Sequence, residues 1–200
     1  MPPMKCLVIL AGGKSTRMGQ DKVFLGIGEE SFLERIFRNA VFVFDKIIIS
    51  TDSEEHKEQI EKLGCGSDPR MQIVLDKFHE CGPMGGLLSV MAETEMEKFA
   101  VIPVDVPLAE MKVLDVMYDM MPSGRQALFL KTSGGIEPLI GVYARESEAA
   151  FREAMDCGDY KIRRVLTDTS VVSLEDLQMT EYDKCFKNIN SKEDYIELYD

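Results

Sequence analysis

Short apolar runs and amphipathic segments alternate along the chain. Residues 5–10, 47–49, 73–75 and 99–102 are mostly apolar, which is typical of strands buried on both faces of a parallel sheet. Between these runs, apolar residues at helical spacing predict helices. The predicted helices cover about residues 31–40, 54–63, 87–95, 108–121 and 146–155, with a further helical turn at 161–166. This alternation of strands and helices predicts an α/β fold.

Local patterns add detail at both ends of the chain. Ser31 precedes the first predicted helix and Glu34 stands three residues later, which is the pattern of a capping box. In the second half, residues 127–131 and 138–143 flank a Ser-Gly-Gly turn, and residues 170–174 predict a late strand. Because two strands joined by a short turn run antiparallel, the sheet is expected to be mixed but mostly parallel.

The chain length of 200 residues suits one compact domain. We therefore predict a single-domain, Rossmann-like three-layer α/β sandwich over residues 1–200, with a mostly parallel mixed sheet. The sequence shows no linker, internal repeat or low-complexity segment. Its apolar runs are far shorter than the ~18 residues of a membrane-crossing helix, so no membrane partner is expected.

Acidic residues outnumber basic ones. The chain has 35 Asp and Glu residues against 23 Lys and Arg residues, so its formal net charge is −12. A surface of this sign repels nucleic acids and anionic lipids, and neither is expected as a partner. A phosphate-bearing ligand must then be held locally, by basic side chains, backbone N–H groups or a metal. Widely spaced cysteines and a start without a signal-peptide pattern predict a reduced, cytoplasmic protein.

Directly after the first predicted strand, residues 10–22 read LAGGKSTRMGQDK. In an open α/β sheet, ligands bind beyond the carboxyl ends of the strands, and this loop leaves that edge. Its spacing fits neither the Walker pattern nor the dinucleotide pattern G-x-G-x-x-G. Two adjacent glycines free backbone N–H groups to face an anion, and Lys14, Arg17 and Lys22 place three cations within nine residues. The loop is a candidate polyphosphate site.

Two aspartates follow predicted strands. Asp105 comes after the strand at 99–102 and between two prolines. Mg²⁺ combines a few carboxylates with water and phosphate oxygens, so one well-placed aspartate can serve it, and Asp105 is the candidate metal ligand. Asp76, after the strand at 73–75, can accept hydrogen bonds from the hydroxyl or amino groups of a ligand. A glycine-rich loop at 82–86, GPMGG, can bring the backbone close to a base or sugar.

The two histidines receive no chemical role from the sequence. His56 stands among Glu and Lys residues on a predicted surface helix, and His79 lies in an acidic loop. Neither has a partner at the spacing of metal ligands. The thirteen methionines are interpreted as core filling.

Five blocks of sequence carry a family resemblance. They are LAGGKSTRMGQDK at 10–22, GPMGGL at 82–87, PVDVPL at 103–108, EPLIGVY at 137–143 and NINSKED at 188–194. In this order they resemble the molybdenum cofactor guanylyltransferases, within the larger nucleotidyltransferase family that has a glycosyltransferase-A-like fold. The chain departs from the family at Val104, where cysteine is frequent, at Ser191, where threonine is usual, and at 26–32, which lacks a Pro-Leu pair.

The resemblance implies transfer of GMP from GTP to the terminal phosphate of molybdopterin or molybdenum cofactor, with release of pyrophosphate and with Mg²⁺ as cofactor. We expect Arg17, Lys22 and Asp105 to be catalytic, and Asp105 to bind the metal. The expected nucleotide-binding residues are Leu10, Ala11, Gly12, Gly13, Lys22, Asp52, Asp76 and Asp105, and the expected acceptor-binding residues are Asn188 and Asn190.

Two alternatives stay open. A cytidylyltransferase that acts on molybdopterin or on a sugar-alcohol phosphate would use the same type of reaction. A regulatory or adaptor protein could bind a nucleotide without transferring it, since a fold does not dictate a function. The presence of both Lys22 and Asp105 speaks against a mere binder. We expect a monomer, with at most transient contacts to molybdoenzyme maturation proteins.

Overall fold

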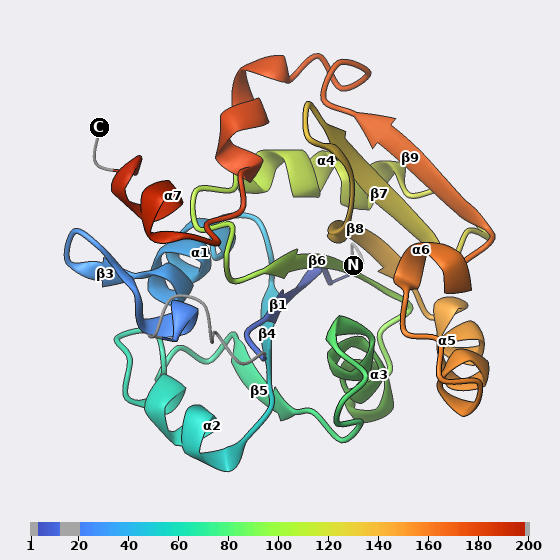
Figure 1. Cartoon of the computed structure of the whole chain (residues 1–200), viewed down its shortest axis with the longest axis horizontal. Coiled ribbons are helices and arrows are strands. Elements are labelled where there is room, and N and C mark those ends of the chain that lie inside the picture. The colour runs from blue at the N-terminus through green and yellow to red at the C-terminus, as the bar shows by residue number, and fades with distance from the viewer. Residues whose placement is uncertain (1–3, 13–20, 199–200) are drawn as a thin grey trace.

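The computed structural model describes residues 4–12 and 21–198, and seven of its strands form one sheet in the order β5-β4-β1-β6-β8-β7-β9 (Figure 1). In chain order these strands are β1 (Cys6–Leu10), β4 (Lys46–Thr51), β5 (Met71–Leu75), β6 (Lys98–Pro103), β7 (Ala127–Thr132), β8 (Gly135–Ala144) and β9 (Thr169–Ser173). β8 runs antiparallel to β6 and β7, whereas the other neighbouring pairs are parallel. The predicted mixed, mostly parallel sheet is confirmed.

Helices cover both faces of the sheet and give three layers (Figure 1). On one face pack α1 (Phe32–Ala40), α2 (Glu54–Glu61) and α4 (Met111–Met120). On the other pack α3 (Pro83–Glu93), α5 (Ser147–Asp156) and α6 (Ile162–Val165). The predicted three-layer α/β architecture is therefore confirmed. Within residues 4–12 and 21–198, no helix is both long enough and apolar enough to span a membrane.

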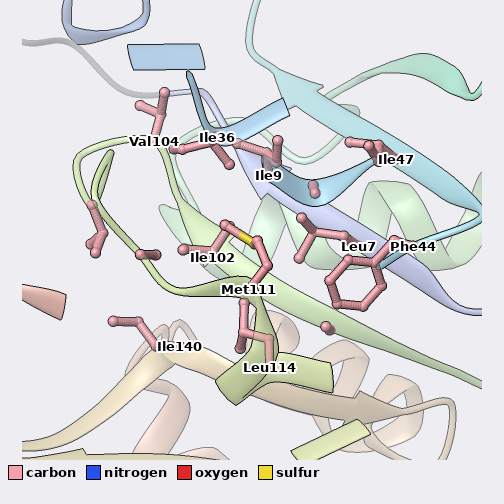
Figure 2. Close-up of a cluster of buried hydrophobic side chains, with 14 of the residues drawn as sticks. Leu7, Ile9, Ile36, Phe44, Ile47, Ile102, Val104, Met111, Leu114 and Ile140 are labelled. Carbon is pink, nitrogen blue, oxygen red and sulfur yellow. The ribbon is translucent and has the colours of Figure 1, made fainter. Parts of the chain in front are cut away.

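The central strand β1 is buried along its whole length, which explains its continuous apolar sequence. Leu7 and Ile9 point into the core beneath α1 and α4, where Figure 2 shows them beside Ile47 and Ile102 of the neighbouring strands. The alternate residues of β1 point into the core beneath α3. Successive side chains of a strand face opposite sides, so both faces of β1 demand apolar residues.

The helix α1 begins as the sequence predicts. The Glu34 N–H donates to Ser31 Oγ at 3.2 Å, and the Ser31 N–H donates to Glu34 Oε2 at 2.9 Å. This is the reciprocal pattern of a capping box, which satisfies two donors that the first helical turn leaves free.

The helix α3 begins earlier than the sequence predicts. It starts at Pro83, because proline suits the first turn of a helix and Gly82, with φ of 57°, makes the reversal before it. Gly85 and Gly86 therefore belong to the helix and not to a loop. A Cβ on Gly86 would lie 2.6 Å from Ser50 Oγ, so the glycine allows α3 to approach β4 closely.

Several short elements are absent from the prediction. They are η1 (Lys22–Phe24), the hairpin of β2 (Gly26–Ile27) and β3 (Glu30–Ser31), η2 (Thr180–Phe186) and α7 (Lys192–Ile196). None is long enough to show a hydrophobic period. Between η2 and α7 the buried Ile189 packs into the core, which returns the C-terminal segment to the sheet.

Candidate functional site

A cleft of about 1100 Å³ opens at the carboxyl ends of β1, β4, β5 and β6. Most of the predicted site residues that the structure describes line it: Leu10, Ala11, Gly12, Lys22, Asp52, Asp76, Asp105 and Asn190. Asn188 is partly buried and is not among the residues that line the cleft. Gly13, Lys14 and Arg17 lie outside the described residues.

The ends of neighbouring strands bring these residues together. Leu10 is the last residue of β1, Asp52 and Asp76 directly follow β4 and β5, and Asp105 stands two residues beyond β6. These four strands are mutually parallel and their ends are level in register. Residues that follow neighbouring parallel strands meet at one edge of the sheet, as the sequence predicts.

Lys22 joins two of the candidate residues. Its Nζ donates to Asn190 Oδ1 at 2.6 Å and to Asp105 Oδ2 at 3.1 Å. The Ile189 N–H donates to the carbonyl oxygen of Asp105 at 2.8 Å, which fastens the C-terminal segment to the turn after β6. The fold thus collects residues from three distant parts of the chain around one ammonium group.

Asp105 has a carboxylate oxygen that can serve a metal. Its Oδ1 is buried and has no hydrogen-bond partner among the described residues, a costly state that a bound cation would relieve. The oxygens of Asp105 and Asn190 are of the kind that Mg²⁺ prefers. In the described part of the chain, no group of three or more His, Cys, Asp or Glu residues could hold a metal. A bound Mg²⁺ would therefore take most of its oxygens from phosphate and water.

The lining of the cleft is acidic. Among the described residues, Lys22 is the only lysine or arginine that lines it. The carboxylates that line it are Asp21, Asp52, Asp76, Glu80 and Asp105. This surface would repel a triphosphate unless further positive charge entered with it. A divalent cation at Asp105 is one source of that charge.

Asp76 forms a second polar centre in the cleft. The Ser50 hydroxyl donates to Asp76 Oδ1 at 2.5 Å. Burial raises the pKa of Asp76 and the negative charge of Asp52 raises it further, against the effect of the Ser50 hydrogen bond. A Cβ on Gly12 would lie 3.1 Å from Asp76 Oδ2, so the backbone after β1 passes close to this carboxylate. Asp76 is placed to accept a hydrogen bond from a ligand that enters along that backbone.

Glu137 is a titratable group to which the sequence gave no role. The pairing of β7 with β8 shifts register after Phe129, so that three residues of β8 bulge out between Glu137 and Gly141. Burial raises the pKa of Glu137, and the negative charge of Asp105 raises it further. Glu137, at the edge of the bulge, is therefore a second carboxyl group whose protonation is affected by the charge of the candidate metal ligand. Hydrophobic periodicity carries no signal for a bulge, because the extra residues interrupt the alternation.

His56 is buried, contrary to the surface position that its charged sequence neighbours predict. It is 7% exposed. Its Nδ1 lies 2.6 Å from Thr51 Oγ1, and its Nε2 lies 3.1 Å from Asp21 Oδ2 at the rim of the cleft. The sequence did contain one indication of this burial. Ile60 lies four residues after His56, and residues at that spacing share one face of a helix.

Known proteins are similar to this chain over most of its length. A protein of Methanosarcina mazei named "Probable molybdenum cofactor guanylyltransferase" is 26% identical over 193 residues, which cover 94% of this chain and 86% of the relative. A protein of the same name from Aquifex aeolicus is 29% identical, with 93% and 86% covered. The crystal structure of molybdopterin-guanine dinucleotide biosynthesis protein A from Archaeoglobus fulgidus has the same fold, with a TM-score of 0.79, 21% identity and 96% of each chain covered.

The family model of the MobA-like NTP transferase domain matches residues 7–175. The match takes in nearly all of the seven-stranded sheet and the strand ends that form the cleft. Asn190 and the helix α7 lie beyond it. Because the match covers most of the 200 residues, the chain belongs to the MobA-like NTP transferase family and is a nucleotidyltransferase.

Proposed function

We propose that the protein transfers GMP from GTP to the terminal phosphate of molybdopterin or molybdenum cofactor, with release of pyrophosphate and with Mg²⁺ as cofactor. The contact of the Lys22 ammonium with Asp105 and Asn190 carries the proposal, because it joins a fixed cation to a candidate metal ligand at the end of β6. The names of the M. mazei and A. aeolicus relatives support the choice of guanylyl group and acceptor.

The reaction joins two anions, because the acceptor phosphate attacks the α-phosphorus of the triphosphate. A terminal phosphate has a second pKa of ~6 and is largely ionised at neutral pH, so it needs no strong general base. Catalysis then depends on bringing the reactants together and on stabilising the negative charge of the leaving pyrophosphate. A fixed ammonium group beside a buried carboxylate oxygen suits this task.

The phosphate-binding roles are those that the family resemblance implies. The Ala11 N–H donates to the Ser50 carbonyl oxygen at 2.8 Å, so the backbone N–H groups assigned to the triphosphate are those of Gly12, Gly13 and their neighbours. Lys22 contacts the α-phosphate, and Arg17 contacts the leaving pyrophosphate. Asp105 would hold Mg²⁺, which would supply positive charge to the phosphate oxygens.

The remaining candidate residues bind the two organic groups. By the resemblance, Leu10, Asp52 and Asp76 contact the guanine or ribose. In support, Leu10 ends β1, Asp52 and Asp76 directly follow β4 and β5, and all three line the cleft. Asn188 and Asn190, in the C-terminal segment, are the proposed acceptor-binding residues. Asn190 lines the cleft and its side-chain oxygen would be available to a metal.

The test is a product analysis with purified protein. The protein is incubated with Mg²⁺, molybdopterin and each of the four common nucleoside triphosphates in turn, and pyrophosphate release and product mass are measured. GTP should give the guanylyl product at the highest rate. A preference for CTP would instead identify the cytidylyltransferase alternative. Nucleotide binding without any pyrophosphate release would identify the regulatory or adaptor alternative.

The same proposal covers the state of the protein in the cell. Residues 1–200 form a single transferase domain that acts as a monomer in the cytoplasm and meets molybdoenzyme maturation proteins only transiently. Size-exclusion chromatography with light scattering tests the oligomeric state, with a monomer mass of 22.5 kDa expected. A dimer mass would contradict this part of the proposal.

A further inference from the structure

The ring of His56, on α2, links two parts of the cleft that are distant in sequence. Its Nδ1 lies 2.6 Å from Thr51 Oγ1, at the end of β4, and 3.9 Å from Asp52 Oδ1. Its Nε2 lies 3.1 Å from Asp21 Oδ2, directly before η1. The ring also packs edge-on against Phe24 of η1, with the ring centres 5.4 Å apart. One side chain therefore contacts both β4 and the turn that follows the phosphate-binding loop.

The carboxylate that meets His56 also fixes the turn that carries Lys22. Asp21 Oδ1 accepts a hydrogen bond from the Val23 N–H at 3.0 Å, and the Asp21 carbonyl accepts one from the Phe24 N–H at 3.2 Å. Asp21 thus caps η1 with one carboxylate oxygen and meets His56 with the other. Lys22 is the next residue, so a single intermediate residue connects the His56 ring to the ammonium group of the site.

The charges around the ring favour its protonated form. Burial would lower the pKa of His56, but the contact with Asp21 and the negative charges of Asp21, Asp52 and Glu55 outweigh it, and the pKa is raised. Among the described residues, the carboxylates whose charges act on the ring are Asp21 directly before η1, Asp52 directly after β4 and Glu55 of α2 itself. A histidine that merely fills an apolar core would show the opposite shift, because desolvation disfavours its charged form.

We propose that His56 is a positioning residue for nucleotidyl transfer, which holds the turn bearing Lys22 in place by bridging Thr51 and Asp21. The inference rests on the proposed contact of Lys22 with the α-phosphate. His56 itself touches no reacting atom. Without the bridge, the Lys22 ammonium samples more positions and fewer complexes are productive, so kcat falls more than the KM for the nucleotide rises.

Two substitutions test the two ring nitrogens separately. The side-chain amide of glutamine reaches about as far as Nε2 of histidine, whereas that of asparagine reaches only as far as Nδ1. His56→Gln therefore keeps an N–H group within reach of Asp21 and gives up the contact with Thr51, whereas His56→Asn keeps only the contact with Thr51. The turn that bears Lys22 is held through Asp21, so loss of the Asp21 contact is the change that releases it. We expect kcat of H56Q within about 3-fold of the wild type and kcat of H56N at least about 10-fold lower, with a smaller change in KM.

The neighbouring residue on α2 provides the control. Lys57 pairs with Glu54 at 3.4 Å and takes no part in the bridge, so Lys57→Gln should leave kcat unchanged. The melting temperature of each variant is measured beside its rate. Equal kcat in H56Q and H56N, or losses that simply follow the loss of thermal stability, would overturn the proposal.

A double variant that combines H56N with Lys22→Ala tests whether His56 acts on the rate through Lys22. If His56 acts through Lys22, adding H56N to K22A should change the residual rate by less than about 2-fold, because two residues in one pathway are not additive. A further loss in the double variant as large as that in the single H56N variant would show that His56 acts independently of Lys22. That result would overturn the proposal.

Nuclear magnetic resonance tests the bridge without any activity. The chain has two histidines, so substitution of His79 assigns both ring signals. The pKa of His56 should lie above the ordinary value of 6.5 and should fall in Asp21→Asn. A pKa below that of free histidine would overturn the bridge.

The failure of the proposed function would be distinct from the failure of this inference. Wild-type protein that released no pyrophosphate from any nucleotide would count against the proposed function alone. Hydrogen exchange would then decide the inference, because the Phe24 and Leu25 N–H groups bond within the turn. Faster exchange of these two amides in H56N than in K57Q supports positioning by His56, and equal exchange overturns it.

Discussion

Replacement of Gly86 by alanine should separate Ser50 from Asp76. A Cβ on Gly86 would lie 2.6 Å from Ser50 Oγ and 3.3 Å from Asp76 Oδ1, and Cβ atoms essentially never approach another atom within 3.0 Å. Ser50 is 1% exposed, so its hydroxyl cannot escape into solvent. It has to rotate, and the hydrogen bond of 2.5 Å to Asp76 is lost.

Two opposing contributions set the change in the free energy of unfolding that Gly86→Ala should cause. A hydrogen bond to a charged group contributes about 1.5–3 kcal/mol, and the residual overlap in a packed core adds to its loss. Alanine in a helix interior is favoured over glycine by about 1 kcal/mol. The free energy of unfolding should therefore fall by about 2 kcal/mol, which corresponds to a melting temperature lower by about 4–8 °C for a chain of this size. Circular dichroism at rising temperature measures it.

A double-mutant cycle separates this mechanism from a general packing defect. Ser50→Ala removes the hydroxyl that the new methyl group would meet, so G86A should cost much less in the S50A background than in the wild type. The coupling energy should be about 1 kcal/mol or more. Equal costs of G86A in the two backgrounds would refute the argument. The pKa of Asp76 should also rise in G86A, because the Ser50 hydrogen bond lowers it in the wild type.

Three further predictions concern the site and the C-terminal segment that carries α7. On the proposed function, Lys22→Ala and Asp105→Ala each remove a charge that acts on the reacting phosphates, so each should lower pyrophosphate release at least about 100-fold with an unchanged circular dichroism spectrum. Wild-type rates would remove the site assignment. Chelation of Mg²⁺ should abolish transfer and excess Mg²⁺ should restore it, whereas transfer that survives chelation would contradict the metal role of Asp105. Hydrogen bonds from Ser191 and Lys187 lower the pKa of Asp194 from 3.8 to about 2. The ionised carboxylate therefore stabilises α7 fully above pH 3.8, and this stabilisation is lost as the pH falls through about 2. The amide signals of α7 should follow this loss in the wild type and show a smaller pH-dependent change in Ser191→Ala; identical acid titrations would refute the role of the cap.

Asp76 and Asp105 could be predicted from the sequence because the place of a residue at a strand end depends only on chain order, whereas Leu10 and Asp52 were expected from the family resemblance. A buried apolar run identifies a parallel strand, and the residue after it must lie at the carboxyl edge of the sheet. Leu10, Asp52, Asp76 and Asp105 line the cleft for this reason. The start of α1 was equally predictable, because a capping box is a local pattern of two residues.

Other features of the site depend on contacts that no local pattern encodes. His56 faces inward because α2 packs that face against the sheet, and its charged neighbours in sequence conceal this. Glu137 borders an irregularity of strand pairing, and the charge of Asp105 contributes to its raised pKa. Asn190 follows a segment whose helical elements are too short to show a period, and its position depends on the burial of Ile189. In each case the position of the residue depends on tertiary contacts, which a local sequence pattern does not contain.

The order of the strands explains why the cleft needs a link between its parts. From β1 the chain builds outward to β4 and β5, and it then returns to place β6 on the other side of β1. A sheet built in this way has a crevice where the chain reverses direction, beyond the ends of its central strands. Asp52 and Asp76 come from the β4 side of that crevice and Asp105 from the β6 side, while Lys22 reaches across from the loop after β1. On the proposed function, the base and the reacting phosphates are thus held by separate parts of the sheet, and transfer requires that these parts keep a fixed distance. The contact of His56 with both Thr51 and Asp21 joins the end of β4 to the turn that bears Lys22, which gives a buried histidine on a charged helix a physical reason.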